Sequence, residues 1–195
     1  SNTPLSRVQV RLNASDSTAG KTAVTDRNGR FELAELPAGK FTVSASKANY
    51  VGISYGQTRP RGLGKTLELA EGQTIANMNF TMQRTGVITG RILDEFGDPV
   101  VDVMVMAMRS QYVNGERRMM PAGGRPATTN DVGDYRIYGL QPGQYYVSAT
   151  LRNFTMGDTD DRSGYSATYY PGTGSMAEAQ RMTVAAGQTI NGINM

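Results

Sequence analysis

The chain has 195 residues, and its 20 lysines and arginines against 17 aspartates and glutamates leave a net charge of +3. Histidine and cysteine are both absent, which excludes Ser-His-Asp triads, Cys-His dyads, thiolate zinc sites and disulfides and leaves oxygen-ligand metals such as calcium. The charge balance does not favour a nucleic-acid partner, and no apolar run approaches the ~20 residues of a transmembrane helix.

Short stretches of alternating apolar and polar or small residues run through the chain. Val8–Leu12, Phe31–Leu33 and Phe41–Ala45 alternate in the first half, and residues 87–94 alternate with less contrast in the second. This period of two is typical of strands with one face on a core. Gly, Pro, Asn and Asp interrupt the chain every ~8–12 residues, as in antiparallel sandwiches. The sequence therefore predicts an all-β chain.

The sequence also repeats itself. Thr25–Leu33 reappears as Thr129–Ile137, and Glu71–Ile75 is echoed by Ala186–Ile190. Two copies of one module predict two small domains in tandem. We expect each domain to be a seven-stranded Greek-key β-sandwich of the prealbumin or Ig-like kind, and place the two at residues 3–84 and 86–195.

The two copies differ at their beginning. The second copy opens with a predicted strand, Gly86–Asp94, followed by a turn that ends at Pro99. Aligning Pro4 with Pro99 leaves the first copy without an opening strand. The second copy stops at Met195, whereas the first continues through the matched position to Met82. We therefore expect a fragment of a larger protein, whose neighbouring domains would be its partners.

Several motifs resemble the carboxypeptidase regulatory-like domain, a transthyretin-like seven-stranded sandwich. They are the Gly-x-Ile-x-Gly-x-Ile-x-Asp stretch from Gly86, the Gly97–Val100 turn, the repeated Thr-Asx-x-x-Gly-x-aromatic motif, Leu-x-Pro-Gly-x-Tyr-x-Val from Leu140, and a closing strand after Gly-Gln-Thr. The resemblance covers residues 86–195 as a full copy and residues 3–84 as a copy without its first strand. It implies an exported bacterial module, found beside peptidase domains, at the periplasmic side of outer-membrane receptors and in surface proteins. The implied location is extracellular, cell-surface or periplasmic, and no signal peptide is visible.

The related collagen-adhesin B-type repeats carry Lys–Asn isopeptide bonds. All four lysines of this chain lie in the first copy, so the second copy cannot form such a bond. The first copy lacks the strand that would normally carry the lysine. The sequence therefore does not favour an isopeptide bond in either copy.

Two insertions in the second copy, near residues 110–127 and 155–163, are predicted to be loops, where binding is commonly added to a rigid sandwich. The second insertion holds Asp158, Asp160 and Asp161, and closely spaced carboxylates can bind calcium. Their spacing does not match an EF-hand loop. The alternative interpretation is a solvated acidic loop without a metal.

Three tyrosines are candidate ligand contacts: Tyr112 in the first insertion, and Tyr165 and Tyr169 beyond the acidic run. An aromatic ring offers a flat apolar face to a sugar, and the carboxylates of Asp158 and Asp160 can accept hydroxyl protons. These five residues form the candidate site for a surface glycan. The absence of tryptophan weakens the carbohydrate interpretation.

Other features of the second copy are interpreted as structural or as contact surfaces. Tyr170 aligns with Tyr55 of the first copy and is therefore predicted to be structural. Asn114-Gly115 is a hairpin turn signal, so the first insertion is predicted to be a projecting ribbon. Met119 and Met120 form either a soft tip that contacts a protein partner or a cover that folds back on the sandwich.

No pair of carboxylates is placed as in a hydrolase, so we expect no catalytic residues, no cofactor and no enzymatic activity. The preferred function is a non-catalytic module that spaces or docks neighbouring domains of an exported or cell-surface bacterial protein. One alternative is a carbohydrate- or calcium-binding module that uses the loops of the second copy. Another is an accessory domain of a peptidase or an outer-membrane receptor.

Overall fold

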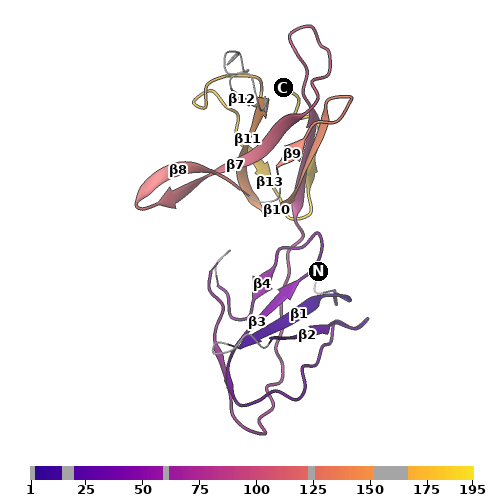
Figure 1. Ribbon diagram of the computed structural model, residues 1–195, viewed down its shortest axis with the longest axis vertical. Coiled ribbons are helices and arrows are strands. Elements are labelled where there is room, and N and C mark those ends of the chain that lie inside the picture. The colour runs from indigo at the N-terminus through magenta and orange to yellow at the C-terminus, as the bar shows by residue number, and fades with distance from the viewer. Residues whose placement is uncertain (1–2, 15–19, 59–61, 123–125, 152–166) are drawn as a thin grey trace, which may run out of the picture. The chain divides into compact units, whose positions relative to one another are not determined.

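The computed structural model in Figure 1 describes five stretches of the chain, residues 3–14, 20–58, 62–122, 126–151 and 167–195. These stretches contain strands and turns and no helix, so the predicted all-β fold is confirmed. A membrane-spanning helix, long and apolar enough to cross a bilayer, is accordingly not found in them. The chain divides into two compact units, here termed unit 1 (Ser1–Gln83) and unit 2 (Arg84–Met195).

In the described part of unit 1, five strands form one antiparallel sheet. The strands are β1 (Gln9–Ala14), β2 (Gly20–Val24), β3 (Gly39–Ser46), β4 (Ile53–Ser54) and β5 (Leu67–Leu69). β1 pairs with β2 and β3, and β3 also pairs with β4 and β5. Because successive side chains of a strand point to opposite faces, alternate residues are buried, among them Val10, Leu12 and Val43.

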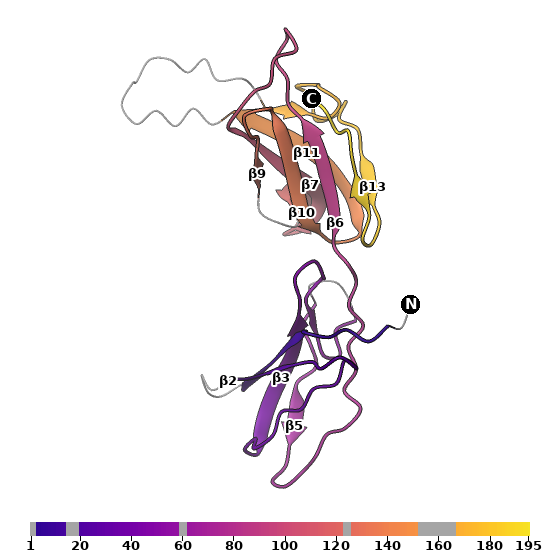
Figure 2. The same ribbon diagram turned by 90° about the vertical axis from the view of Figure 1, so that its right-hand side faces the viewer.

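Unit 2 has two sheets within the described residues, which Figure 2 shows as facing layers. The smaller sheet has the order β10-β6-β14, and the larger has the order β12-β11-β7-β8, with β9 on β7 and β13 on β11. The core lies between them, since Ile88 and Ile137 of the smaller sheet and Val105, Tyr145 and Val147 of the larger are at most 2% exposed. The strands are β6 (Gly86–Arg91), β7 (Val103–Val113), β8 (Glu116–Pro121), β9 (Ala127–Thr128), β10 (Asp134–Leu140), β11 (Gly143–Leu151), β12 (Thr168–Tyr169), β13 (Met182–Val184) and β14 (Thr189–Ile190).

The repeated sequence folds into the same hydrogen-bonded turn in both units. In unit 1 the Thr25 hydroxyl donates to the carbonyl oxygen of Leu5 at 2.6 Å and accepts the backbone N–H of Val8 at 2.9 Å. In unit 2 the Thr129 hydroxyl makes the two matched bonds at 2.8 and 2.9 Å. Both threonines are buried. Each one therefore fixes the path of the chain that enters β1 in unit 1 or β7 in unit 2.

The two units differ in the segments that flank β6 in unit 2 and in the matched segments of unit 1. In unit 2, β6 lies between β10, with which it pairs antiparallel, and β14, with which it pairs parallel. In unit 1, Phe31–Leu33 was predicted to be a strand, but the structure assigns none to it or to residues 74–80, which match 189–195. A strand needs neighbours for its backbone N–H and C=O groups, and the described residues of unit 1 contain no counterpart of β6. The seven-stranded sandwich expected for residues 3–84 stays a prediction.

Candidate functional site

The structure describes two of the six residues predicted to bind a ligand. Tyr112 and Tyr169 lie in β7 and β12. The other four lie outside the described residues: Asp158, Asp160, Asp161 and Tyr165. The calcium loop and most of the glycan site therefore stay predictions. Elsewhere, the described stretches contain no group of three or more acidic side chains that could hold a metal ion.

The two described tyrosines are not brought together. Tyr169 pairs with Ser148 of β11, and Ser148 pairs with Met106 of β7. Tyr112 lies further along β7, roughly 20 Å from Met106 at the usual rise of a strand. Tyr112 is 78% exposed, whereas Tyr169 is partly buried. One sugar residue cannot contact both rings.

The first insertion forms the predicted ribbon. β7 and β8 pair antiparallel, and Asn114 and Gly115 make the turn between them with φ values of 52° and 82°. Positive φ at both central residues is the geometry that a tight hairpin turn requires. Met119 is partly buried and Met120 is 39% exposed, and neither belongs to the described core cluster of unit 2. Of the two alternatives for these methionines, this placement favours the exposed contact surface.

Tyr170 has the structural role predicted from its match to Tyr55. The backbone N–H of Tyr170 donates to the carbonyl oxygen of Val147 at 3.0 Å, and that of Tyr55 donates to Val43 at 2.8 Å. Both rings are partly buried against the core of their own unit. At both positions the backbone attaches a connecting segment to a central strand, and the ring packs against the core.

Two side chains of the smaller sheet of unit 2 have shifted pKa values, and both shifts have structural causes. Burial raises the pKa of Tyr135, with a further contribution from Tyr170, and the Tyr135 hydroxyl donates to the carbonyl oxygen of Ile193 at 2.6 Å. A hydrogen bond and the charge of Asp134, 2.8 Å from Nε, raise the pKa of Arg91. General acid–base catalysis favours a pKa near the working pH, so these shifts do not indicate a catalytic pair.

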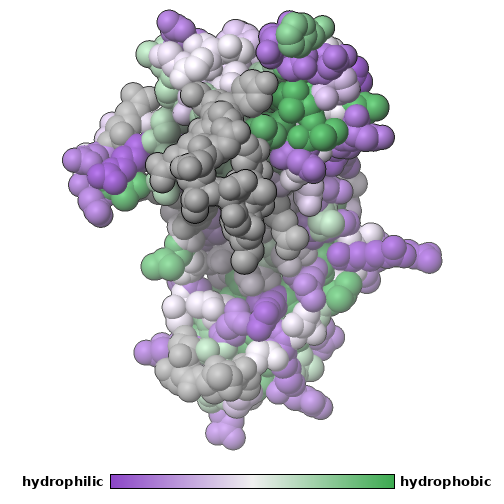
Figure 3. Space-filling view, turned by 45° about the horizontal axis from the view of Figure 1, so that its top comes forward, coloured by the Kyte–Doolittle hydropathy of each residue, from purple (hydrophilic) through white to green (hydrophobic). Residues whose placement is uncertain are grey.

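Exposed apolar side chains do not by themselves mark a site. Leu63 is 97% exposed and Phe96 is 84% exposed, and both lie in connecting segments between strands. On the face of the molecule in Figure 3, apolar residues form small groups between hydrophilic ones. Surface apolar residues of this kind are normal in soluble proteins and need no functional explanation.

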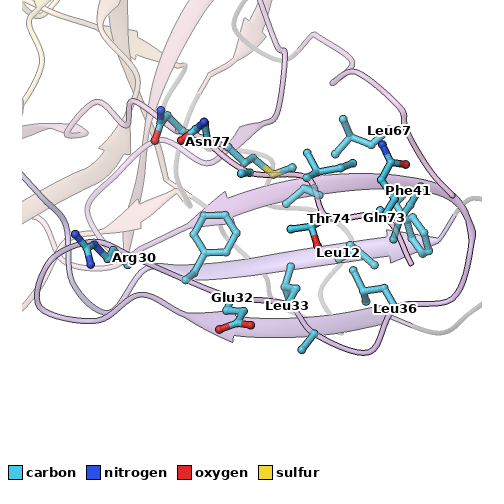
Figure 4. Close-up of a pocket in the computed structure, with 18 of the residues that line it drawn as sticks. Leu12, Arg30, Glu32, Leu33, Leu36, Phe41, Leu67, Gln73, Thr74 and Asn77 are labelled. Atoms are coloured by element: carbon cyan, nitrogen blue, oxygen red, sulfur yellow. The ribbon is translucent and has the colours of Figure 1, made fainter. Parts of the chain in front are cut away.

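Unit 1 contains a groove that the sequence analysis did not identify as a site. Its volume is about 810 Å³, and it runs between residues 28–36 and 72–79. Its apolar lining includes Leu12 of β1, Phe41 of β3 and Leu67 of β5, as the close-up in Figure 4 shows.

Comparison with known families gives a match for unit 1. The family model of the carboxypeptidase regulatory-like domain matches residues 1–83. This confirms the resemblance drawn from the sequence for the first copy.

Two solved structures of bacterial pilins are also similar to the chain. The minor pilin GBS52 of Streptococcus agalactiae is 15% identical, with 99% of this chain and 83% of the pilin covered and a TM-score of 0.37. A streptococcal ancillary pilin is 17% identical, with 97% of this chain and 57% of the pilin covered and a TM-score of 0.40. No curated protein matches the chain by sequence.

Proposed function

We propose that the chain is a non-catalytic structural module of an exported or cell-surface bacterial protein, in which it spaces or docks neighbouring domains. The main observation behind this proposal concerns the polar side chains that occur at matched positions in both units. These side chains bond to the backbone of their own turns, so they stabilise the fold and do not face a ligand.

The shared aspartate and asparagine illustrate this use. Oδ1 of Asp26 accepts two backbone N–H groups of its turn, both at 2.8 Å. Oδ1 of Asn130 accepts the two matched groups at 3.2 and 2.8 Å. Asparagine cannot act as a general base or a nucleophile in place of aspartate. A position that accepts either residue therefore serves the turn and not a reaction.

The shared glutamines have the same role. Oε1 of Gln73 accepts the backbone N–H of Ala70 at 2.8 Å, and Oε1 of Gln188 accepts that of Ala185 at the same distance. A catalytic site requires convergent groups that are free to meet a substrate. The repeated polar positions do not supply such groups.

A spacing role predicts a defined distance between domains fused to the two ends of the chain. The test places the chain between two fluorescent domains and measures energy transfer in single molecules. We expect a narrower distribution of distances than for a Gly/Ser linker of equal length, because a flexible linker samples a broad range. A distribution as broad as that of the linker would contradict the spacing role.

The ligand-binding alternative is tested separately by calorimetry with calcium chloride and by a glycan array. The structural role predicts no heat of binding and no glycan hits. If calcium binds, the variant with Asp158→Asn, Asp160→Asn and Asp161→Asn identifies the acidic loop as its site. Binding of either ligand by the intact chain would overturn the structural proposal. The accessory role beside a peptidase or an outer-membrane receptor stays an alternative that depends on the parent chain.

A further inference from the structure

We propose that the ribbon formed by β7 and β8 docks an extended segment of a partner protein, which adds as a further strand along the outer edge of β8. The partner segment is net acidic and carries two adjacent apolar residues followed by an acidic one. The inference rests on the proposed docking role and deepens it, because it names the surface that docks and the chemistry of its partner.

β8 lies at the edge of the larger sheet in the part of unit 2 that the structure describes. The sheet order ends in β7-β8, and β8 pairs with β7 from Glu116 opposite Val113 to Pro121 opposite Met108. In Figure 1 the ribbon extends away from the rest of unit 2, and the described core cluster contains none of residues 108–121. An edge strand presents backbone N–H and C=O groups on its outer side, which are a template for an added strand.

The hydrogen-bond pattern indicates which backbone groups of β8 face outward. The N–H of Ala122 donates to the carbonyl oxygen of Ala107 at 2.8 Å, so these opposite residues form a bonded pair. Bonded and non-bonded pairs alternate along an antiparallel ladder, which directs the backbone groups of Met119 and Arg117 away from β7. Pro121 follows at the next outward position, where its missing N–H costs the ladder nothing. An added strand would therefore bond to Met119 and Arg117.

The ribbon is a basic element on an acidic part of the chain. Residues 85–195 hold nine lysines and arginines and eleven aspartates and glutamates, and three of the nine but only one of the eleven lie in residues 108–121. Charged residues on an edge strand disfavour indiscriminate pairing, and a net positive charge selects a partner of opposite charge. A second copy of the ribbon would bring the same net charge to this edge, so the charge does not favour self-pairing.

The side chains of β8 give the order of residues in the partner segment. Met119 and Met120 are its apolar positions, and Met120 is 39% exposed; methionine adapts readily to a contact surface. On one face, Nη2 of Arg118 lies 2.7 Å from Oε2 of Glu116, and both side chains are more than 60% exposed. An antiparallel partner should present apolar residues opposite the two methionines, an acidic residue opposite Arg118 and a basic one opposite Glu116.

The exposed edge of unit 1 does not offer the same surface. β2 also lies at the end of a sheet order among the described residues. Nζ of Lys21, the single charged residue of β2, donates to the carbonyl oxygens of Ala34 and Glu35 at 2.7 and 2.8 Å. The charge of β2 therefore serves unit 1 itself, which makes β2 a control edge within the same chain.

The experiment measures two peptides on two versions of the ribbon in the full chain. The peptides Thr-Val-Ile-Glu-Asp-Lys and Thr-Val-Ile-Lys-Asp-Glu, each between Gly-Ser flanks, have the same composition and net charge. The variant combines Glu116→Arg with Arg118→Glu, which exchanges the two charges but keeps the net charge of the ribbon. Fluorescence anisotropy of labelled peptide measures Kd. We expect the wild type to bind the first peptide roughly fivefold more tightly than the second, and the variant to reverse this order.

Hydrogen exchange locates the bound peptide. At a peptide concentration roughly ten times Kd, exchange of the Met119 and Arg117 amides should slow by up to about tenfold. The amides of Arg118 and Met120, which the alternation directs toward β7, should slow less. Exchange within β2 should not change.

A backbone control tests strand addition itself. N-methyl groups at the third and fifth residues of the first peptide, which would face Met119 and Arg117, should abolish binding because they remove the N–H groups that bond to β8. N-methyl groups at the second and fourth residues should leave binding in place. Equal loss with both methylation patterns, no binding of either plain peptide, or equal Kd values in all four combinations would overturn the proposal. A dimer in sedimentation, with the Met119 amide protected in the chain without peptide, would assign the edge to a second copy and would overturn the proposed partner.

Failure of the docking proposal and failure of the structural role are distinguishable. Absence of peptide binding would leave the distance distribution of the spacing test unchanged. Calcium or glycan binding would contradict the structural role, but it would not alter the preference of the wild type for the first peptide.

Discussion

Units 1 and 2 have the same turns but differ in how completely their cores are enclosed. The Thr25 and Thr129 hydroxyls make matched bonds, and Arg7 and Asp102 have matched positive φ values of 55° and 59°. In unit 2, β6 lies between two segments and makes them a sheet, whereas in unit 1 the matched segments border a groove. The comparison shows that an alternating sequence forms a strand only where a neighbouring strand satisfies its backbone.

The largest expected effect comes from removing the fit of β6. Gly90→Ala places a Cβ 1.9 Å from the carbonyl oxygen of Ile193. Either β6 or residues 189–195 must therefore move. We expect the free energy of unfolding of unit 2 to fall by about 3 kcal/mol or more, as for other severe steric changes in a core. Hydrogen exchange of β10 and of residues 189–195 would measure this loss.

The matched control for this variant is Gly174→Ala, where a Cβ would meet nothing within 4 Å. It should change the stability of unit 2 by no more than about 0.5 kcal/mol. Exchange within β1 and β3 of unit 1 should be the same in both variants, since the substitutions lie in unit 2. An unaltered unit 2 in Gly90→Ala would contradict the role given to β6.

The next effect tests whether the two units depend equally on their shared turn. Thr25→Val and Thr129→Val keep the size of the side chain but remove a hydroxyl that makes two hydrogen bonds, one of them to a buried N–H. Each substitution should lower the stability of its own unit by about 1–3 kcal/mol, because a buried N–H group loses its acceptor. Chemical denaturation combined with hydrogen exchange would assign each loss to its unit. If only one of the two substitutions destabilises its unit, the two turns have the same geometry but contribute differently to stability.

The sequence predicted the shared elements well because their signals are local. Alternation in Val8–Leu12 and Phe41–Ala45 indicated β1 and β3, and Asn114-Gly115 indicated the turn of the β7–β8 ribbon. Each of these signals depends on neighbouring residues or on the alignment of the two copies.

The sequence did not predict which of the alternating segments become strands. Phe31–Leu33 alternates as its counterpart in β10 does, but it is not a strand in the structure. Its state depends on a partner that is distant along the chain, and alternation does not report such a partner. The groove of unit 1 was missed because its lining mixes apolar residues such as Leu12 and Phe41 with polar ones such as Arg30. These residues come from distant parts of the chain and form no local sequence pattern.

A smaller effect separates the two units by pH. Tyr135, 4% exposed, donates its hydroxyl to Ile193 at 2.6 Å, whereas unit 1 has Phe31 at the matched position. Burial raises the pKa of Tyr135 above its ordinary value of 10, so above pH 10 the unfolded chain binds fewer protons at this residue than the folded chain. The free energy of unfolding of unit 2 should therefore fall as the pH rises above about 10, by at most ~1.4 kcal/mol per pH unit.

Tyr135→Phe isolates this contribution. At neutral pH the variant should lose about 1 kcal/mol, the usual net value of one hydrogen bond. Above pH 10 the difference between wild type and variant should shrink, since the variant has no proton to release at this position. Parallel stability curves of wild type and variant up to pH 11 would contradict the assignment. At each pH, hydrogen exchange of unit 1 should be the same in the wild type and in the variant.

The smallest effect concerns the turn before residues 74–80 in unit 1 and the matched turn before residues 189–195 in unit 2. Oε1 of Gln73 and Oε1 of Gln188 each accept a backbone N–H at 2.8 Å, and both turns contain a glycine with φ near 70°. Gln73→Ala and Gln188→Ala should each cost about 0.5–1 kcal/mol, because the freed N–H groups are exposed and water can replace the lost acceptor. Denaturant unfolding of each variant would measure the two values. If β6 is the main support of residues 189–195, Gln188→Ala should speed the hydrogen exchange of these residues only slightly. Gln73→Ala should speed the exchange of residues 74–80 more strongly. Equal changes in the two segments would show that β6 does not support residues 189–195.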